Sequence, residues 1–443
     1  MSPTHAMARK RPTMELNAVA LMASTVLTAL FGVLFWIVAA NMLPPADVGR
    51  ASATLSAVTF LAGLAQLNIM SVLLRFLPGA GTGAAGFIGR AYGLAVGTGL
   101  LVTAGFLLLG YGRDLLGGGW AVPVFFCCAV ICYAVFLIQD GALTALGAAV
   151  WVPLENVLTG ALRLGLLIVL VMVSTQWGAL VALVVPTLVA IAVVNWFVFR
   201  RLVPRHVRSS TATTGVGWRS IRGFVAGDYV ASALSSCVAL LPPVLVSAQL
   251  GSEAAAYFYV PWFVGVQFST LMWSIAMALV VEHAAQAAAF SRLLKRALQL
   301  TSAVALTACV VVVIGAPLIL ALLGSGYADE GTTTLRLIAL SFPFSAGFVL
   351  FTALSVSRRK LVPLVVALAI KAAVFLVVTE IGLTTFGIDG LAVLYLACEA
   401  ATALAVAPVG VRFYRELSAG AGAAAADATG PAPAPALTPG RTL

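Results

Sequence analysis

The sequence predicts an all-α polytopic membrane protein, and its composition, its apolar runs and the placement of its charges support this fold class. Of its 443 residues, 62% are hydrophobic and only 9% are charged, and the mean hydropathy is +1.08. A typical soluble domain is about 45–50% apolar and about 25% charged. Too few charged groups remain to cover a water-soluble surface. This excludes ordinary soluble enzymes, disordered chains and secreted disulfide scaffolds.

Twelve apolar runs are long enough to cross a bilayer, since a spanning helix needs about 20 predominantly apolar residues. The first half of the chain has six predicted spans, at residues 16–40, 51–74, 87–110, 121–145, 152–174 and 177–199. The second half has six more, at residues 223–249, 255–281, 297–323, 333–356, 361–380 and 388–411. The connections are short, so no sizeable soluble domain is inserted between spans.

The charges between the spans orient the chain in the membrane. With the N-terminus inside, the outer loops hold only two basic residues, Arg50 and Arg113. The main basic segments then all lie inside, at residues 9–11, 200–222, 292–296 and 358–360. Cytoplasmic loops are enriched in Lys and Arg, so we expect a multi-pass protein of the cytoplasmic membrane with both termini in the cytoplasm. The net charge of +10 comes from these loops, and no nucleic-acid partner is expected.

The spans divide the chain into five predicted regions. They are a cytoplasmic basic leader (1–15), a six-helix lobe (16–199), a cytoplasmic basic linker (200–222), a second six-helix lobe (223–415) and a disordered Ala/Pro-rich cytoplasmic tail (416–443). Because each lobe has an even number of spans, the lobes would be parallel repeats related by a pseudo-two-fold axis along the membrane normal. The linker arginines either set the topology or contact anionic lipid head groups.

Three motifs resemble a known family. The first two motifs lie in the run from Leu34 to Pro78: the pattern L-x-P-x-x-x-G at Leu43–Gly49, and the sequence Arg-Phe-Leu-Pro at the end of the run. The third motif is Trp-Val-Pro-Leu-Glu-Asn, which starts at Trp151. In these motifs the chain resembles the bacterial polysaccharide-biosynthesis flippases for O-antigen and exopolysaccharide. Their superfamily also contains multidrug exporters and the lipid II flippases, which usually have fourteen spans. Twelve spans argue against the lipid II branch.

The resemblance implies a V-shaped transporter with a cationic central cavity between its two lobes. It implies alternating access, by which a polyprenyl-diphosphate-linked oligosaccharide crosses the membrane for surface polysaccharide biosynthesis. A polysaccharide polymerase and glycosyltransferases are candidate partners, besides the membrane lipids. No cofactor, metal or covalent reaction is implied, so the protein would not be an enzyme. Coupling to an ion gradient occurs in parts of the superfamily.

Three charged residues lie near the centre of their spans: Arg163, Lys371 and Glu399. A charge at mid-bilayer costs about 2.5–3.5 kcal/mol on insertion scales, so such residues face a cavity or a partner. Lys371 and Glu399 lie at similar depth on consecutive spans, where they line a substrate site or form an internal ion pair. Arg163 has no acid at similar depth in its own lobe. Its planar guanidinium suits a diphosphate.

Other polar residues are weaker candidates. Arg75, at the inner end of its span, either binds substrate or marks topology. Four carboxylates near cytoplasmic helix ends are candidates for an inner gate, for ion coupling, or for wetted helix ends: Asp140, Glu155, Asp228 and Glu282. Five polar side chains would line a cavity or form interhelical hydrogen bonds: Asn68, Gln139, Asn156, Asn195 and Gln267.

Two other functions were weighed. A cation-coupled multidrug exporter of the same superfamily would prefer an acidic cavity, whereas two of the three mid-span charges are basic. A membrane glycosyltransferase would need carboxylates or histidines on a substantial loop, and the outer loops are too short to provide one. The glycan, the coupling ion and the oligomeric state do not follow from the sequence.

Overall fold

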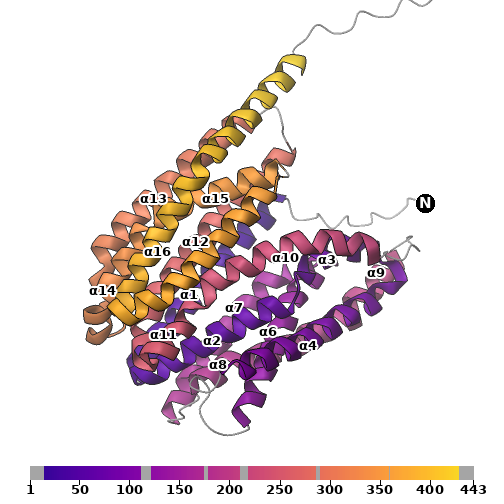
Figure 1. Ribbon diagram of the computed structural model, residues 1–443. Helices are drawn as coiled ribbons and strands as arrows, with labels where there is room; N and C mark the ends of the chain where they lie inside the picture. Colours follow the sequence, from indigo (N-terminus) through magenta and orange to yellow (C-terminus); the bar gives the residue numbers. More distant parts are fainter. Residues whose placement is uncertain are drawn as a thin grey trace, which may run out of the picture.

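The computed structural model describes residues 14–110, 121–173, 178–209, 218–285, 290–358 and 360–428. Within these residues the chain is helical throughout, without any strand. Figure 1 shows the helices as two bundles that lie close together at one end and diverge toward the other.

The first bundle holds the helices that precede residue 210. They are α1 (Met14–Met42), α2 (Pro45–Ala65), α3 (Ile69–Phe76), α4 (Ala84–Leu108), α6 (Ala121–Ala145), α7 (Trp151–Met172), α8 (Gly178–Phe197) and α9 (Val203–Ser209). A π-helical turn, η3 (Val198–Leu202), joins α8 to α9 without a break in the helix. One apolar core packs α2, α3, α4 and α6 against each other.

The second bundle holds the remaining helices. They are α10 (Trp218–Leu240), α11 (Pro242–Leu250), α12 (Ser252–Ala285), α13 (Phe290–Ala321), α14 (Ser325–Leu340), α15 (Phe342–Ser357) and α16 (Val362–Ala428). The segment α16 consists of two helical limbs that meet at Gly387, whose φ of +63° is a conformation that glycine adopts without steric cost. Two apolar cores hold this bundle together.

Each of the twelve predicted spans coincides with a helix, with a bent pair of helices, or with one limb of α16. Among the described residues, seven helices are long and apolar enough to cross a membrane, and two bent pairs would raise this number to nine. The all-α polytopic class is therefore confirmed.

Three of the predicted spans are broken near the middle, and the tenth span divides into α14 and α15 with a bend of 40°. The second span divides into α2 and α3, because Leu67 and Asn68 have φ values of 48° and 54° in the left-handed region. The seventh divides into α10 and α11 with a bend of 40°, next to Pro242 and Pro243. Proline lacks an amide N–H and clashes with the preceding turn. The break between α10 and α11 therefore follows from the sequence.

Two predicted boundaries need correction. The linker expected at 200–222 begins as helix, because η3 and α9 extend α8 to Ser209 and α10 already starts at Trp218. The tail expected to be disordered from residue 416 is helical up to Ala428. This part is rich in alanine, the strongest helix former. Residues 429–443 and the leader before Met14 lie outside the described residues.

The two bundles meet through an interface core, which we define as the buried apolar cluster shared by α1, α2, α7 and α8 with α12, α13 and α14. At this end α2 and α12 are in backbone contact at Gly49, where an added Cβ would lie 1.6 Å from the carbonyl oxygen of Ser252. The side-chain amide of Asn41 donates a hydrogen bond of 2.9 Å to the carbonyl of Leu322. The bundles also touch along α10, where the Tyr229 hydroxyl donates a hydrogen bond of 3.2 Å to the carbonyl of Leu64 in α2. We call the end that contains the interface core the closed end.

Gly49 provides a test of the closed end. Gly49→Ala should lower the free energy of unfolding by about 1–3 kcal/mol, because the methyl group forces α2 and α12 apart. The control is Gly93→Ala in α4, where an added Cβ meets nothing within 4 Å. Denaturant unfolding of the purified protein measures both, and equal stability of the two variants would contradict the close contact.

Candidate functional site

The first candidate site is built around Arg163, halfway along α7. Its Nη2 donates a hydrogen bond of 2.8 Å to the hydroxyl oxygen of Thr187 in α8. That hydroxyl in turn donates its proton to the carbonyl of Leu183, at 2.9 Å. The guanidinium carbon lies 5.6 Å from the centre of the Tyr133 ring in α6, a cation–π distance. Three helices of the first bundle therefore hold Arg163.

The positive charge of Arg163 has only neutral partners. The side chain is half-buried, and its Nε is buried without a hydrogen-bond partner. Among the described residues, no carboxylate forms an ion pair with it. A guanidinium has five N–H donors, and the single bond to Thr187 uses one of them. The remaining donors have no described hydrogen-bond partner, and the donor on Nε is buried.

Arg163 lies next to the contact between the bundles. Leu167, one helical turn further along α7, is fully buried in the interface core. The ring of Tyr259 in α12 lies 4.6 Å from that of Trp36 in α1, and both side chains are buried in the interface core. Arg163 sits one turn away from the closed end.

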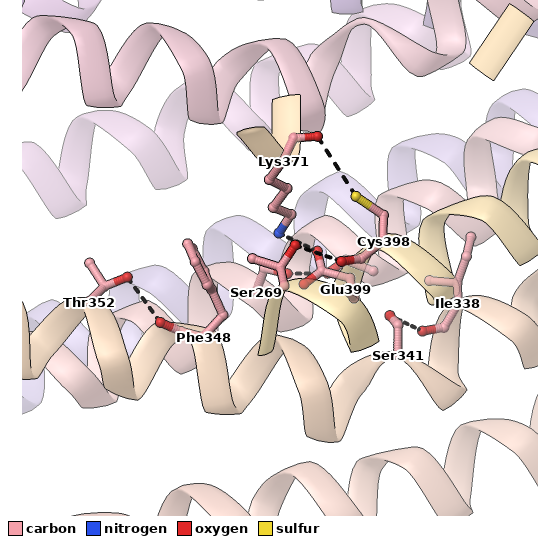
Figure 2. A network of polar contacts seen from close by, with 10 residues as sticks. Ser269, Ile338, Ser341, Phe348, Thr352, Lys371, Cys398 and Glu399 are labelled. Atoms are coloured by element: carbon pink, nitrogen blue, oxygen red, sulfur yellow. Dashed lines mark hydrogen bonds and ion pairs between the residues drawn. The ribbon is translucent and has the colours of Figure 1, made fainter. Parts of the chain in front are cut away.

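The second candidate site joins Lys371 and Glu399 on the two limbs of α16. Lys371 Nζ lies 2.6 Å from Glu399 Oε1, and both side chains are buried. Figure 2 shows this ion pair between neighbouring helices, with Cys398 beside it. The ammonium group also lies 4.8 Å from the ring centre of Phe348 in α15. In this conformation each charge is already neutralised by the other.

A third polar cluster, the first-bundle network, connects four helices by hydrogen bonds. Tyr92 of α4 donates to Asn195 of α8 at 2.7 Å, Asn195 donates to Gln139 of α6 at 2.9 Å, and Gln139 donates to Glu155 of α7 at 2.6 Å. All three bonds point toward Glu155, whose other oxygen, Oε2, is buried without a partner. Gln139 and Asn195 therefore make interhelical hydrogen bonds.

Asp140 lies close enough to Glu155 for an electrostatic interaction, and its Oδ1 is buried and unpartnered. Within the described part of the chain, neither carboxylate forms an ion pair. The expected gate, in which these carboxylates pair with arginines of the other lobe, is not formed in this conformation. Both groups lie inside the first bundle.

The remaining predicted residues lie elsewhere. Arg75 is exposed on the last turn of α3, with its guanidinium 5.6 Å from the ring centre of Phe76. Asp228 in α10 and Glu282 in α12 have side chains that lie outside the described residues. No three His, Cys, Asp or Glu side chains come together as a metal site among the residues that the structure describes.

The partners of Arg163 were not expected from the sequence. Thr187 follows Pro186 in the middle of α8, and a polar residue beside a mid-span proline is a signal that could have been used, because proline leaves a backbone carbonyl without its helical donor. Tyr133 gives no such signal, because aromatic residues are common throughout the spans.

Comparisons with known proteins identify the fold. No family model and no curated protein sequence matches the chain. Among solved structures, the chain is similar to an inward-facing multidrug resistance MATE family transporter of the MOP superfamily. The TM-score is 0.68 and the sequence identity 15%, and the match covers 91% of this chain and 99% of that chain. An outward-facing structure of such a transporter has a TM-score of 0.61 at 15% identity, over 91% and 95% of the chains.

A third similar structure is the lipid II flippase MurJ in an inward closed conformation, with a TM-score of 0.60 and 12% identity over 92% of this chain and 90% of that chain. The chain therefore has the fold of MOP superfamily transporters over nearly its whole length. At these identities the likeness concerns the fold alone.

The buried ion pair of the second bundle provides a test of its structural role. Lys371→Met should lower the free energy of unfolding by about 3–5 kcal/mol, because it leaves the carboxylate of Glu399 buried without a counter-charge. Adding Glu399→Leu should restore most of this loss. Denaturant unfolding measures both variants, and a double variant as unstable as the single one would argue against the pair.

Proposed function

We propose that this protein moves a polyprenyl-diphosphate-linked oligosaccharide from the inner to the outer leaflet of the cytoplasmic membrane. The observation that carries the proposal is Arg163, a cation in the middle of a membrane helix whose only described partners are the Thr187 hydroxyl and the Tyr133 ring. An uncompensated charge at this depth is costly and indicates function. A diphosphate is the anion that a planar guanidinium binds through paired hydrogen bonds.

The proposed path follows from the position of Arg163. The cation lies one helical turn from Leu167, which belongs to the interface core. In the proposed path, the head group would bind at Arg163 before the closed end opens. The polyprenyl tail would remain in the lipid. The bundles would then rock against each other, with the bend between α10 and α11 as a point of flexure.

The similarity to MOP superfamily transporters supports a transport mechanism by alternating access. Transport needs no covalent step, so we propose no enzymatic activity and no cofactor. In the membrane, with both termini in the cytoplasm, the protein would act beside glycosyltransferases and a polysaccharide polymerase.

A cation-coupled multidrug exporter remains the second candidate, because several similar structures are multidrug resistance transporters. The charge at the candidate site favours the flippase. Arg163 would repel an organic cation. The other two charged residues at mid-span, Lys371 and Glu399, form an ion pair with each other. A coupling ion could bind the carboxylates of Glu155 and Asp140 in the first bundle, whether the protein is a flippase or a multidrug exporter.

Replacing Arg163 tests the proposal. Arg163→Gln should reduce flipping of a fluorescent polyprenyl-diphosphate oligosaccharide in proteoliposomes by at least about 100-fold, the loss of a charge-assisted contact of roughly 3 kcal/mol. The control is Arg336→Gln in α14, because Arg336 is exposed and donates only to the Val313 carbonyl among its described contacts. Native flipping by a folded Arg163→Gln protein would refute this site, and export of organic cations would favour the second candidate.

The first-bundle network generates a separate test of ion coupling. Glu155→Gln keeps an oxygen that can accept the Gln139 hydrogen bond but removes the titratable group. We expect its transport rate in proteoliposomes to lose the acceleration produced by an imposed pH gradient. Glu380→Gln, at an exposed carboxylate, serves as the control and should keep it. A response to the gradient in Glu155→Gln as large as in the native protein would assign coupling to another group.

A further inference from the structure

The helix that ends the first bundle is longer than the membrane requires. Residues Gly178–Arg208 form one continuous helical segment of 31 residues. At 1.5 Å per residue it is about 46 Å long, whereas the hydrocarbon core is about 30 Å thick. A tilt of about 20° shortens its projection only slightly. The last turns, in η3 and α9, therefore extend into the head-group region.

Four arginines gather on these last turns. Together with Pro204, they line a cavity of about 420 Å³: Arg200, Arg201, Arg205 and Arg208. All four are exposed. Arg201 and Arg205 are four residues apart, and Arg205 and Arg208 are three apart, so the helix places them on one side. We call this group the arginine cavity.

The charge of the arginine cavity is not compensated by the protein around it. In the part of the chain that the structure describes, none of the four guanidinium groups forms an ion pair. The sequence has no Asp or Glu from Asn156 to Gly227. Like charges at this helical spacing repel one another. A topology signal needs only basic residues in a loop, whereas these gather around one open depression on an ordered helix.

Apolar surface adjoins the arginine cavity. Val193 and Trp196 are exposed on α8, and Trp196 precedes Arg200 by four residues, so the apolar face leads directly to the cavity. A second cavity of about 440 Å³ shares Arg205 and is lined by Trp151 and Phe197, whose ring centres lie 4.8 Å apart. Tryptophan is typical of the membrane interface. The ligand should therefore be an amphiphile rather than a soluble anion.

We propose that the arginine cavity binds the phosphate of an anionic phospholipid in the inner leaflet, with the acyl chains along the exposed face of Val193 and Trp196. The guanidinium groups donate hydrogen bonds to the phosphate oxygens, for which their planar geometry is suited. This site is separate from Arg163 in the middle of α7, and it does not depend on which substrate the protein transports.

The test compares lipid retention between charge-matched variants of the full chain. Native mass spectrometry counts phosphatidylglycerol retained by the protein in detergent, with phosphatidylcholine as the zwitterionic reference. Arg201→Gln combined with Arg205→Gln should weaken phosphatidylglycerol binding about tenfold, through the loss of charge-assisted hydrogen bonds. The matched control removes two exposed charges at the start of α13, by Lys295→Gln with Arg296→Gln, and should retain native binding.

A second variant keeps the test valid if the glutamine variant does not insert. Arg201→Lys with Arg205→Lys preserves the positive charge that orients the helix but loses the planar donors, and it should bind phosphatidylglycerol several-fold more weakly. Native binding in the lysine variant, an equal loss in the α13 control, or displacement of the lipid by millimolar inorganic phosphate would overturn the proposal.

Discussion

The cost of placing charge inside a membrane is the constraint on which this structure depends. An ion in hydrocarbon needs a counter-charge, a hydrogen-bonding partner or access to water. Lys371 has the counter-charge of Glu399 at 2.6 Å, and Glu155 accepts a hydrogen bond from Gln139 at 2.6 Å. Arg163 has only a hydroxyl and an aromatic ring among the described residues. Of these charges, Arg163 is the one whose compensation is least complete, and it is therefore the best candidate for binding an anion.

The contact between the bundles determines what surrounds Arg163 on the side of the closed end. Gly49 allows the backbones of α2 and α12 to touch, and the interface core fills the space beside this contact with apolar side chains. Such a core excludes water, so it can act as a barrier across the membrane. Leu167 belongs to the core and Arg163 lies one turn below it on the same helix. In the alternating-access mechanism proposed above, opening the barrier would expose Arg163, the proposed binding group, to the other side of the membrane.

Depth separates the two cationic regions of the first bundle. The arginine cavity lies at the end of a helix that outreaches the hydrocarbon core, where water and salt screen its charges. It can attract anionic head groups but cannot hold any of them as selectively as a buried group. Arg163 lies at mid-helix, where screening is weak and one hydrogen bond carries more energy. The same residue type is therefore suited to general lipid binding at the surface and to recognition of one anion in the interior.

Several features followed from the sequence by itself: the helical class, the positions of the long apolar helices, the break at Pro242 and the charged residues in the middle of these helices. Each depends on local composition, because the bilayer demands long apolar helices wherever the chain crosses it. The ion pair of Lys371 with Glu399 depends on how the two limbs of α16 pack against each other. The break at Leu67 and Asn68, the helical start of the linker and the surroundings of Arg163 depended on the tertiary structure. Thr187 and Tyr133 come from two other helices, and no local pattern records how helices rotate against one another.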